Sequence, residues 1–590
     1  MCNSLLMSHN LNQFRPRVKI MKSIIQAMIL ACAVIQATAQ TLNNGIILPA
    51  EWPPRYGLPT VAKEMPVPYL TDKPSVMPIN NGRQLFVDSF LIARTNLKTV
   101  YHTPDFYQGN PVLEPSEEWE KTTDGAPYAA PFSDGIWYDD KERIFKMWYL
   151  AGAGMMHKQS KQTFYTCYAE SEDGKKWHKV NLDVVPGTNI CDTCRRDAAT
   201  IWLDREESNP ERRWKMFVVQ FMPRDKRFNG YSWQLVLKYS PDGRHWSRGV
   251  AQSGEVEDRT SAFFNPFTRR WVISMRGETP VSFRSRYYIE NANAETLVSV
   301  AHRPNWQNDD QNVRFWFTPD DKELRHPKYP EVKPGIYNFD CIAYESIMLG
   351  QYSAWCGPEN NVCKRNGIQK RNVIELGYSR DGFHFARPSH QPFMNVNETE
   401  GAWNWGNVQS INGTPLIVGD SLYFYCSGRR LNNIMWDSYT STGLATMRRD
   451  GFVSLHADKK EGYITTERLT FDGRYFFVNA DLKAKGASLC VELLDADGNP
   501  IPGFTKAECT AMQNADKTKQ MITWKTKKDV VELAGRTLSA KFYIKNGDLY
   551  AFWVSPWASG ESRGYIAGGG PGLNSSGQDV IADTIRVSHE

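Results

Sequence analysis

The chain has 590 residues, and its 70 Lys and Arg residues nearly balance its 65 Asp and Glu residues, which leaves a formal net charge of +5 at pH 7. A charge this small and this evenly mixed excludes the basic footprint of a nucleic-acid-binding protein. The length allows more than one domain. Aromatic residues are abundant, with 19 Trp, 26 Tyr and 28 Phe, which suits β-strands and also suits stacking on sugar rings.

Residues 1–39 have the features of a signal peptide, so we expect export by a bacterium to the periplasm, the cell surface or the medium. Lys22 precedes an apolar run at 24–35, and a small-x-small cleavage motif ends at Ala39. The residues before Met21 are interpreted as an over-long start. The apolar run is too short to predict a membrane span. Cleavage before Cys32, which would leave a lipid anchor on that cysteine, is the alternative.

Residues 40–81 contain many prolines and are predicted to form an extended N-terminal arm. Beyond this arm a Ser-x-Asp-Gly motif recurs, beginning at Ser171, Ser240 and Ser379. Asp-Gly between apolar runs marks a hairpin turn, because Gly accepts a positive φ without steric cost. A weaker copy follows at Asp450-Gly451. The spacings of 69, 139 and 69 residues place a degenerate copy near residue 311 and predict five units of about 69 residues each.

The expected fold class is all-β: a five-bladed β-propeller over 82–458 followed by a β-sandwich over 459–590. Alternation of apolar and polar residues, as in 421–425, is typical of strands. A strand-rich unit of this length fits a four-stranded propeller blade. Residues 84–88 are predicted to be the first propeller strand. After about Gly462 the alternation continues without a cluster of acids, which favours the separate sandwich.

Three aspartates occupy equivalent positions in the predicted repeat. Asp197, Asp258 and Asp340 each precede a short β-type run with a large residue five positions later. Because each Asp has the same position relative to the strand-like run that follows it, the three would lie at the same level on three inner strands. A ring of blades would then bring their carboxylates together at its axis. Glycoside hydrolysis requires two such carboxyl groups. Structural alternatives are a strand cap for Asp197, an ion pair with Arg259 for Asp258, and a buried hydrogen bond or an axial metal for Asp340.

Short motifs extend this pattern. Arg196-Asp197 is followed by Ala198, and two further strings run over 340–350 and 403–409. With the five-unit layout, these motifs resemble the invertases and fructanases of glycoside hydrolase family 32, whose motif is Arg-Asp-Pro. They resemble more closely the family-32-like proteins of exported bacterial glycan-degrading systems. The resemblance implies that Asp197 stabilises the transition state, and that Asp258, in rough register with the family's acid/base Glu, donates the proton.

The nucleophile is where the chain departs from this family. The family carries an Asn-Asp-Pro-Asn-Gly motif in its first blade, and the segment 128–138 takes that place here. Strict register puts Tyr128 at the nucleophile position, whereas Asp134 lies six residues later, on the same face of an unbroken strand. The resemblance therefore leaves Asp340 or Asp134 as the nucleophile or water-activating base, and leaves the fructoside substrate open.

Substrate-binding side chains are expected around these acids. Arg259 would suit a carboxylate or sulfate on the substrate. Trp403 and Trp405 flank an Asn in a Gly-bounded segment, which suits ring stacking at a funnel mouth, although core packing is the alternative for both. Alternation sends Glu345 to the other face of its strand, so a structural role competes there. The predicted binding residues are Arg196, Arg259, Glu345, Trp403, Trp405, Asn407 and Gln409.

Three functional hypotheses follow. The first is an exported glycoside hydrolase acting on a plant or algal polysaccharide or oligosaccharide; the second is a non-catalytic glycan-binding propeller of an uptake system; the third is a lyase or a metal-assisted enzyme. No cofactor is expected, because 11 His residues disfavour a His-built metal centre; a structural calcium on the propeller axis has no sequence indication. Cys191 and Cys194 lack a paired His or second CxxC, which favours a loop disulfide or free thiols over zinc.

Overall fold

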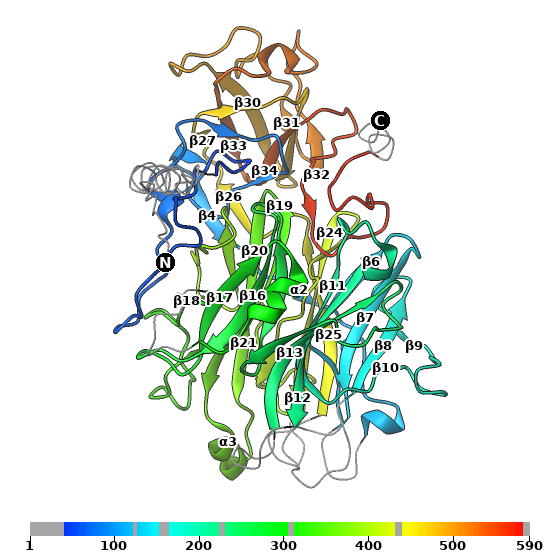
Figure 1. The fold of residues 1–590 in the computed structure, drawn as a ribbon. Coiled ribbons are helices and arrows are strands. Elements are labelled where there is room, and N and C mark those ends of the chain that lie inside the picture. Colours follow the sequence, from blue (N-terminus) through cyan, green and yellow to red (C-terminus); the bar gives the residue numbers. More distant parts are fainter. Residues whose placement is uncertain are drawn as a thin grey trace, which may run out of the picture.

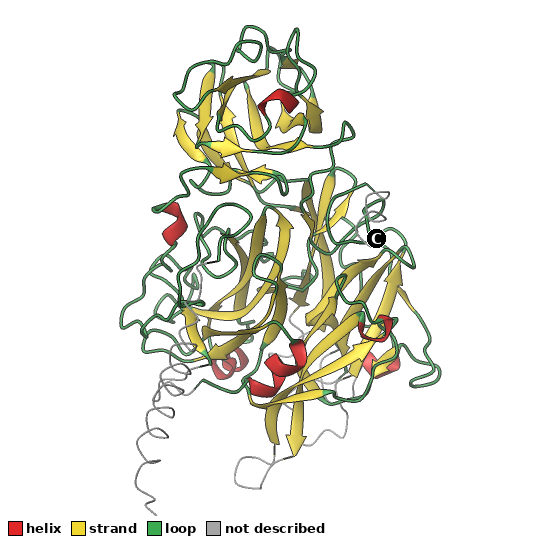
Figure 2. Cartoon of the chain, turned by 45° about the horizontal axis from the view of Figure 1, so that its top comes forward, coloured by secondary structure: helices red, strands yellow, loops and turns green. Residues whose placement is uncertain are grey.

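The computed structural model describes residues 40–121, 127–152, 165–223, 231–304, 312–430 and 439–581. The predicted leader with Cys32, and the predicted turn near residue 311, lie outside these residues. The described chain is mostly β-structure (Figure 2), as the alternating sequence predicts. Its two α-helices, counted over the described ranges, are the short segments α2 (Ala294–Val300) and α3 (Asn360–Asn366).

Three antiparallel sheets follow one another along the chain, and within each the strands pair in sequence order. The first contains β6 (Ala129–Asp139), β7 (Ile144–Ala151), β8 (Tyr165–Ser171) and β10 (Ile190–Asp192), with β9 (His178–Lys179) beside β8. The second contains β11 (Arg196–Leu203), β12 (Trp214–Pro223), β13 (Tyr231–Ser240) and β14 (Ala251–Glu255). The third contains β15 (Ser261–Asn265), β16 (Arg270–Gly277), β17 (Ser285–Asn291) and β18 (Arg314–Phe317).

Two further groups of strands are joined into one larger sheet by a single parallel pairing between Asn372 and Asn407. The fourth group contains β19 (Gly335–Glu345), β20 (Ile347–Gly357) and β21 (Arg371–Ser379), with β35 (Tyr565–Ile566) on the edge of β19. The fifth contains β22 (Asn407–Gln409), β23 (Leu416–Val418), β24 (Ser421–Arg430) and β25 (Tyr439–Arg448). The early strand β5 (Asp105–Phe106) pairs with β25, so the N-terminal region completes the fifth group.

Neighbouring sheets contact one another through their first strands. Strand β6 contacts β11, β11 contacts β15, and β15 contacts β19, while β24 and β25 contact β6. The contacts therefore run through the successive sheets and return from the fifth group to the first. Each sheet packs between two others, which is why both faces of a strand such as β7 are buried.

The Ser-x-Asp-Gly repeats form matching turns that join the sheets. In each, the Ser hydroxyl accepts a hydrogen bond from the Gly N–H, at 2.9 Å for Gly174 and 2.8 Å for Gly243 and Gly382, and all three glycines have positive φ. The turn carbonyls accept hydrogen bonds from the preceding sheets: Trp148 donates to Gly243 at 2.6 Å, and Tyr425 donates to Gly174 at 2.6 Å. The sequence repeat thus corresponds to a repeated contact between sheets.

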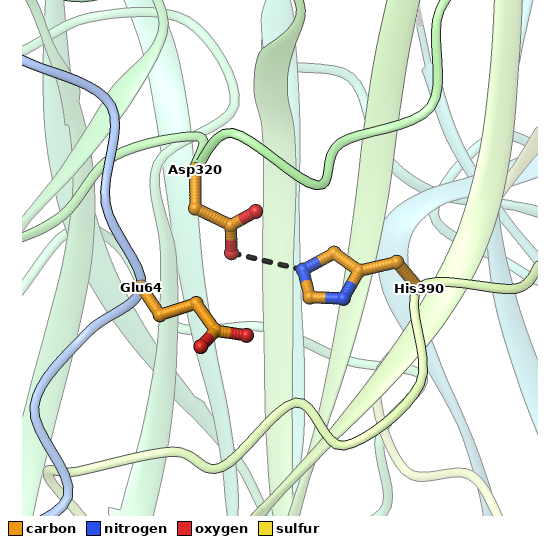
Figure 3. A group of neighbouring side chains, drawn as sticks. All are labelled: Glu64, Asp320 and His390. Atoms are coloured by element: carbon orange, nitrogen blue, oxygen red, sulfur yellow. Dashed lines mark hydrogen bonds and ion pairs between the residues drawn. The ribbon is translucent and has the colours of Figure 1, made fainter.

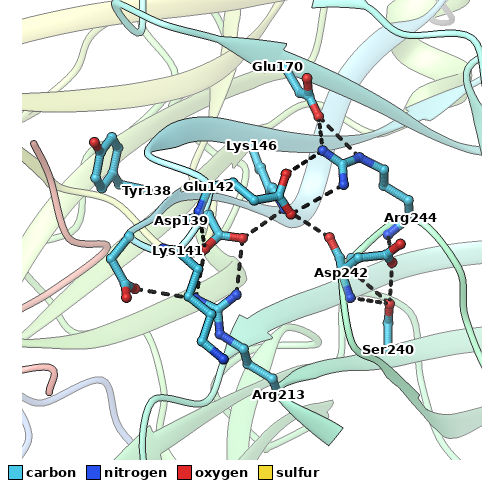
Figure 4. Close-up of polar contacts among 12 residues, drawn as sticks. Tyr138, Asp139, Lys141, Glu142, Lys146, Glu170, Arg213, Ser240, Asp242 and Arg244 are labelled. Carbon is cyan, nitrogen blue, oxygen red and sulfur yellow. Dashed lines mark hydrogen bonds and ion pairs between the residues drawn. The ribbon is translucent and has the colours of Figure 1, made fainter. Parts of the chain in front are cut away.

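Charged side chains reinforce the boundary between the first two sheets (Figure 4). Buried Asp139 at the end of β6 accepts ion pairs from Lys146 at 2.8 Å and from Arg213 at 2.7 Å. Arg244, beside the second Ser-x-Asp-Gly turn, reaches back to Glu142 at 2.6 Å. Asp139 and Lys146 are fully buried, and a buried charge needs a partner to offset its loss of hydration, so these residues are interpreted as structural.

The C-terminal strands build two more sheets, and strands from the N-terminal region complete them. One contains β32 (Asp516–Met521), β29 (Tyr475–Asp481), β34 (Gly547–Ser555), β26 (Val453–Ala457) and β4 (Lys98–Tyr101), with β2 (Gln84–Leu85) beside β34. The other contains β3 (Ile92–Thr95), β27 (Gly462–Thr466), β33 (Ser539–Lys545), β30 (Ser488–Leu494) and β31 (Met512–Gln513). A short pair is formed by β1 (Met77–Pro78) and β28 (Leu469–Thr470).

This arrangement corrects the expected start of the propeller region at residue 82. Strand β2, predicted as its first strand, pairs with β34 instead, and β3, β4 and β26 also belong to the C-terminal sheets. The predicted N-terminal arm is largely irregular, but it is anchored: Leu42, Leu48 and Tyr69 are buried in the hydrophobic core of the C-terminal sheets. Figure 1 shows the blue N-terminal strands among the C-terminal strands, such as β4 beside β26, at the end of the molecule opposite α3.

The cysteines answer the expectation for Cys191 and Cys194. All nine cysteines from Cys167 to Cys509 are free thiols, so the pair Cys191 and Cys194 forms no loop disulfide, and Cys194 instead accepts a hydrogen bond from Lys238. Among the residues that the structure describes, every helix is too short or too polar to cross a membrane.

Candidate active site

Four buried aspartates gather where the first strands of the sheets approach one another. Asp134 lies in β6, Asp197 at the start of β11, Asp258 in the turn before β15, and Asp340 in the middle of β19. Hydrogen bonds through Ser133 and Arg259 link them, because Arg259 Nη2 donates to Ser133 Oγ at 3.3 Å and Ser133 Oγ lies 3.5 Å from Asp340. We refer to these four aspartates as the acid cluster.

Asp197 and Asp258 form an electrostatically coupled pair. Arg259 N donates to Asp197 Oδ2 at 3.0 Å, and Arg259 directly follows Asp258, so the turn brings both carboxyl groups close together. The other oxygen of Asp197, Oδ1, is buried without a hydrogen-bond partner in the described residues. Burial raises the pKa of Asp197 above its ordinary value, and the negative charge of Asp258 raises it further.

Two arginines bind Asp258 and lower its pKa, in contrast to the raised pKa of Asp197. Arg276 Nη1 donates to Oδ1 at 2.6 Å and Arg284 Nη2 to Oδ2 at 3.3 Å. Burial alone would raise the pKa of Asp258, but the positive charges of Arg284 and Arg276, with Arg259, outweigh burial and hold it below the ordinary value. Asp197 therefore keeps its proton to a higher pH than Asp258 does.

Asp134 forms an ion pair with Arg196. The guanidinium donates to Asp134 Oδ1 at 2.9 Å and to Oδ2 at 2.6 Å, and both residues are fully buried. Burial raises the pKa of Asp134 to about 6, against the opposing charge of Arg196. A bidentate pair of this kind joins β6 to β11 and leaves neither carboxylate oxygen without a donor.

Asp340 acts as a hydrogen-bond hub between sheets. Its Oδ2 accepts from Ser410 Oγ at 2.6 Å and from Asn338 Nδ2 at 2.7 Å, and its Oδ1 accepts from Asn412 Nδ2 at 3.1 Å. Asn412 Nδ2 also lies 3.2 Å from Thr200 Oγ1 on β11. Asp340 therefore ties β19 to the segment before β23 and, through Asn412, to β11. Burial raises its pKa.

A group of cations surrounds Tyr337, near the start of β19, and of these the sequence patterns singled out Arg259 but not Arg284 or Lys370. Arg284 Cζ lies 4.4 Å from the centre of the Tyr337 ring, and Lys370 Nζ lies 3.3 Å from the phenol oxygen. Arg259 Cζ lies 5.4 Å from the same ring centre. Burial opposes ionisation of Tyr337, but the charges of Lys370, Arg284, Arg429 and Arg259 outweigh it and lower the pKa of the phenol.

Unsatisfied polar atoms concentrate around the acid cluster. Atoms that are buried and have no hydrogen-bond partner in the described part of the chain include Asp197 Oδ1, Tyr128 Oη, Arg259 Nε and Nη1, Arg284 Nη1, Asn338 Oδ1, Gln409 Oε1 and Asn412 Oδ1. Buried polar groups in folded proteins almost always have partners, so such a concentration marks a place where a ligand or ordered solvent binds.

Glu345 lies away from the acid cluster, contrary to the prediction that it binds substrate with these acids. It ends β19, five residues beyond Asp340, which in an extended strand corresponds to about 17 Å. Its carboxylate pairs with Arg449 at 3.1 Å and accepts from Ser562 Oγ at 2.6 Å. Glu345 lies at the end of β19 that reaches the C-terminal part of the chain, where it contacts Ser562.

The predicted tryptophan platform is also corrected in part. Trp403 is partly buried and packs against Gly428 and Gly443, where an added Cβ would lie 2.3 Å and 1.9 Å from the indole, so one face of Trp403 contacts the hydrophobic core. Trp405 is partly exposed. Asn407 Nδ2 donates to the Lys370 carbonyl at 2.8 Å, and Gln409 Nε2 donates to Asn407 Oδ1 at 2.9 Å, which places both amides beside the cations around Tyr337.

One potential metal-binding group occurs among the described residues, outside the acid cluster. The ligand atoms of Glu64, Asp320 and His390 lie within 4.8 Å of one another (Figure 3). His390 Nε2 lies 2.9 Å from Asp320, while Glu64 pairs with Lys322 at 2.6 Å. These partners already neutralise the group, and we assign it no metal. The expectation that catalysis needs no cofactor remains a prediction.

Comparison with known proteins gives only distant similarities. No family model matches the sequence, and no curated protein matches it. Solved structures that resemble the chain include an N-acetylgalactosamine deacetylase from F. plautii, with 11% identity over 61% of this chain and 96% of that one at a TM-score of 0.38. A fructofuranosidase from Schwanniomyces occidentalis is 10% identical, with a TM-score of 0.33, and the match covers 77% of this chain and 98% of that one. A glycosyl hydrolase from Bacteroides ovatus is 12% identical, with a TM-score of 0.36, and the match covers 62% of this chain and 96% of that one. These TM-scores are too low to support a functional argument, so any function must be argued from the site itself.

Proposed function

We propose that the five successive groups of strands are the blades of a five-bladed β-propeller and that the two C-terminal sheets form a β-sandwich. The return of contacts from β24 and β25 to β6 supports the ring. The matching turns at Gly174, Gly243 and Gly382 support equivalent blades. In this arrangement the acid cluster, whose members lie on or just before the first strands of four successive groups, is near the ring axis.

We propose that the protein is a glycoside hydrolase whose acid pair is Asp197 and Asp258. The observation that carries this proposal is that their environments drive the two pKa values in opposite directions. Such a divided pair supplies one proton donor and one carboxylate, the two groups that hydrolysis of a glycosidic bond needs.

In the proposed reaction, Asp197 protonates the glycosidic oxygen as the bond to the anomeric carbon breaks. Asp258, kept ionised by Arg276 and Arg284, stabilises the positive charge that develops at that carbon. Two routes complete the reaction. Either Asp258 bonds to the anomeric carbon and water later displaces it, or Asp258 takes a proton from the attacking water. In the first route the ionised Asp197 takes a proton from that water and is protonated again. In the second route the proton on Asp258 leaves to solvent, and solvent reprotonates Asp197. Each route consumes one water molecule per bond.

These roles exchange those implied by the resemblance to glycoside hydrolase family 32, in which Asp258 would donate the proton. Two arginines on Asp258 favour its ionised form, whereas burial favours the protonated form of Asp197. Asp134 and Asp340 receive positioning roles, because Asp134 joins β6 to β11 through Arg196 and Asp340 links β19 to the segment before β23 through neutral donors. Neither is assigned as the nucleophile.

The natural substrate and location remain proposals that rest on the sequence. The leader at 1–39 favours export from a bacterium, with either a cleaved peptide or a lipid anchor at Cys32. Exported glycan-degrading enzymes meet plant or algal polysaccharides, and we propose this class of carbohydrate as the substrate.

The test is sugar release from a panel of plant and algal polysaccharides, measured as new reducing ends. We expect the wild-type chain to release sugar from at least one, the variants Asp197→Asn and Asp258→Asn to release almost none, and the exposed control Asp321→Asn to match wild type. Unchanged release by both acid variants would refute the acid pair.

Because both oxygens of Asp258 already bind arginines, a glycan-binding function is the second candidate, and binding without release would favour it.

A further inference from the structure

Two of the cations around Tyr337 form no direct ion pair with a carboxylate in the described residues. Arg284 and Arg276 share Asp258. Lys370 and Arg259, by contrast, have no carboxylate within ion-pair distance among the described residues; Lys370 Nζ donates instead to the Tyr337 hydroxyl at 3.3 Å. Lys370 is 8% exposed and Arg259 is fully buried, so water screens neither charge well.

Two nitrogens of Arg259, Nε and Nη1, and one of Arg284, Nη1, are buried without hydrogen-bond partners in the described chain. Arg259 lies flat against Phe132, with Cζ 3.5 Å from the ring centre, and its backbone amide binds Asp197. These contacts hold the guanidinium beside the acid pair while leaving part of its donor edge unused. Buried donors without hydrogen-bond partners are rare in folded proteins, so these nitrogens point to a partner that arrives with the ligand.

We propose that Lys370, Arg259 and Arg284 form a subsite for an anionic group, a carboxylate or a sulfate ester, on the glycan that the acid pair acts on. The recognition chemistry is charge-assisted hydrogen bonding from ammonium and guanidinium donors. That the ligand is a sugar rests on the proposed function, whereas the anion preference rests on the cations alone. The Tyr337 ring, 3% exposed, separates and orients these donors.

The location of the subsite agrees with a role in substrate selection. Lys370 directly precedes β21 and follows α3, and α3 lies at the end of the molecule opposite the C-terminal sheets (Figure 1). The Lys370 carbonyl accepts from Asn407, which connects the subsite to the polar start of β22. An anionic sugar bound there would lie next to Asp258 through their shared contact with Arg284.

The experiment measures glycan binding by the full-length Asp197→Asn variant, which is expected to bind without turnover. An array of neutral, uronate-containing and sulfated plant and algal oligosaccharides identifies ligands, and titration calorimetry then compares each charged ligand with its neutral counterpart. A uronate is compared with its methyl ester, and a sulfated sugar with its desulfated form. We expect the charged form to bind at least about tenfold more tightly, the factor that a bond to a charged group supplies.

Variants of Lys370 test the assignment of residues. In the same background, Lys370→Met is expected to remove the preference, Lys370→Arg to retain most of it, and the exposed control Lys322→Met to leave it unchanged; thermal unfolding checks that each variant folds. Equal affinity for charged and neutral forms, binding of neutral glycans only, or full preference in folded Lys370→Met overturns the subsite. Anion-selective binding without sugar release by wild type would instead refute the hydrolase proposal and leave the subsite standing.

Discussion

The backbone N–H of Arg259 donates a 3.0 Å hydrogen bond to Asp197 Oδ2. Because Arg259 directly follows Asp258, this one bond fixes the approach of the two carboxyl groups that we propose as the acid pair. Arg259 has a φ of 59°, a left-handed conformation that costs a non-glycine residue about 1–3 kcal/mol. The turn before β15 is thus held in a strained form that places both groups on the same side of the site.

The first prediction concerns the proton donor. Asp197→Asn keeps the size of the side chain but removes the proton that the leaving oxygen needs, so kcat should fall by about a hundredfold to ten-thousandfold. The KM for substrate and the thermal unfolding midpoint should change little. Steady-state kinetics with the best substrate of the polysaccharide panel measure the effect. A fall of less than threefold, matching the Asp321→Asn control, would remove Asp197 from the chemistry.

The second prediction is the pH dependence of kcat/KM. Activity requires Asp258 ionised and Asp197 protonated, so it should be lost on the acid side at the lowered pKa of Asp258 and on the alkaline side at the raised pKa of Asp197. Arg276→Met removes one positive charge from Asp258, which raises its pKa. The acid limb should therefore move to higher pH in Arg276→Met while the alkaline limb stays in place.

The control for this profile is Arg303→Met. Arg303 pairs with the neighbouring Glu257 at 2.9 Å and is half exposed, so its removal should leave both limbs unchanged. An acid limb that moves to lower pH in Arg276→Met, or an alkaline limb that moves alone, would contradict the assignment of Asp258 to the ionised role.

Local repeats explain what the sequence could predict. The motifs at Ser171, Ser240 and Ser379 each form a turn from their own residues, so their spacing indicated equivalent sheets without knowledge of distant contacts. Equal phase of Asp197 and Asp258 before a strand likewise indicated that the two meet. Both inferences rest on short local motifs that recur along the chain.

Pairing between distant segments explains what the sequence could not predict. Strand β2 pairs with β34, more than four hundred residues later, and no local pattern distinguishes that partner from a propeller strand. Lys370 and Arg284 come from different sheets and meet only around Tyr337, so no motif links them. The sequence left the role of Trp403 open, because core packing and sugar stacking both favour tryptophan. In the structure its indole packs closely against Gly428 and Gly443, which supports a packing role.

The third prediction concerns the buried pair between Arg196 and Asp134. Arg196→Met leaves Asp134 without its bidentate partner, and such a loss destabilises a protein by about 3–5 kcal/mol. The double variant Arg196→Met with Asp134→Leu removes both charges, so it should recover most of that loss. Chemical denaturation of the single and double variants measures the coupling. If the double variant were less stable than both single variants, the pair would not be the main role of Asp134.

The last prediction separates Glu345 from the active site. Its carboxylate joins Arg449 and Ser562 beneath the C-terminal sheets, and Arg83 N donates to it at 3.1 Å. Glu345→Gln keeps the shape but removes the charge that neutralises Arg449, so the thermal unfolding midpoint should fall. Because about 17 Å of extended strand separates Glu345 from Asp340, kcat and KM should stay within twofold of wild type. Glu532→Gln, an exposed exchange in the C-terminal region, provides the control and should alter neither quantity. A selective rise in KM for Glu345→Gln at unchanged stability would instead return this residue to substrate binding, and would show that the ligand extends along β19 far beyond the acid cluster.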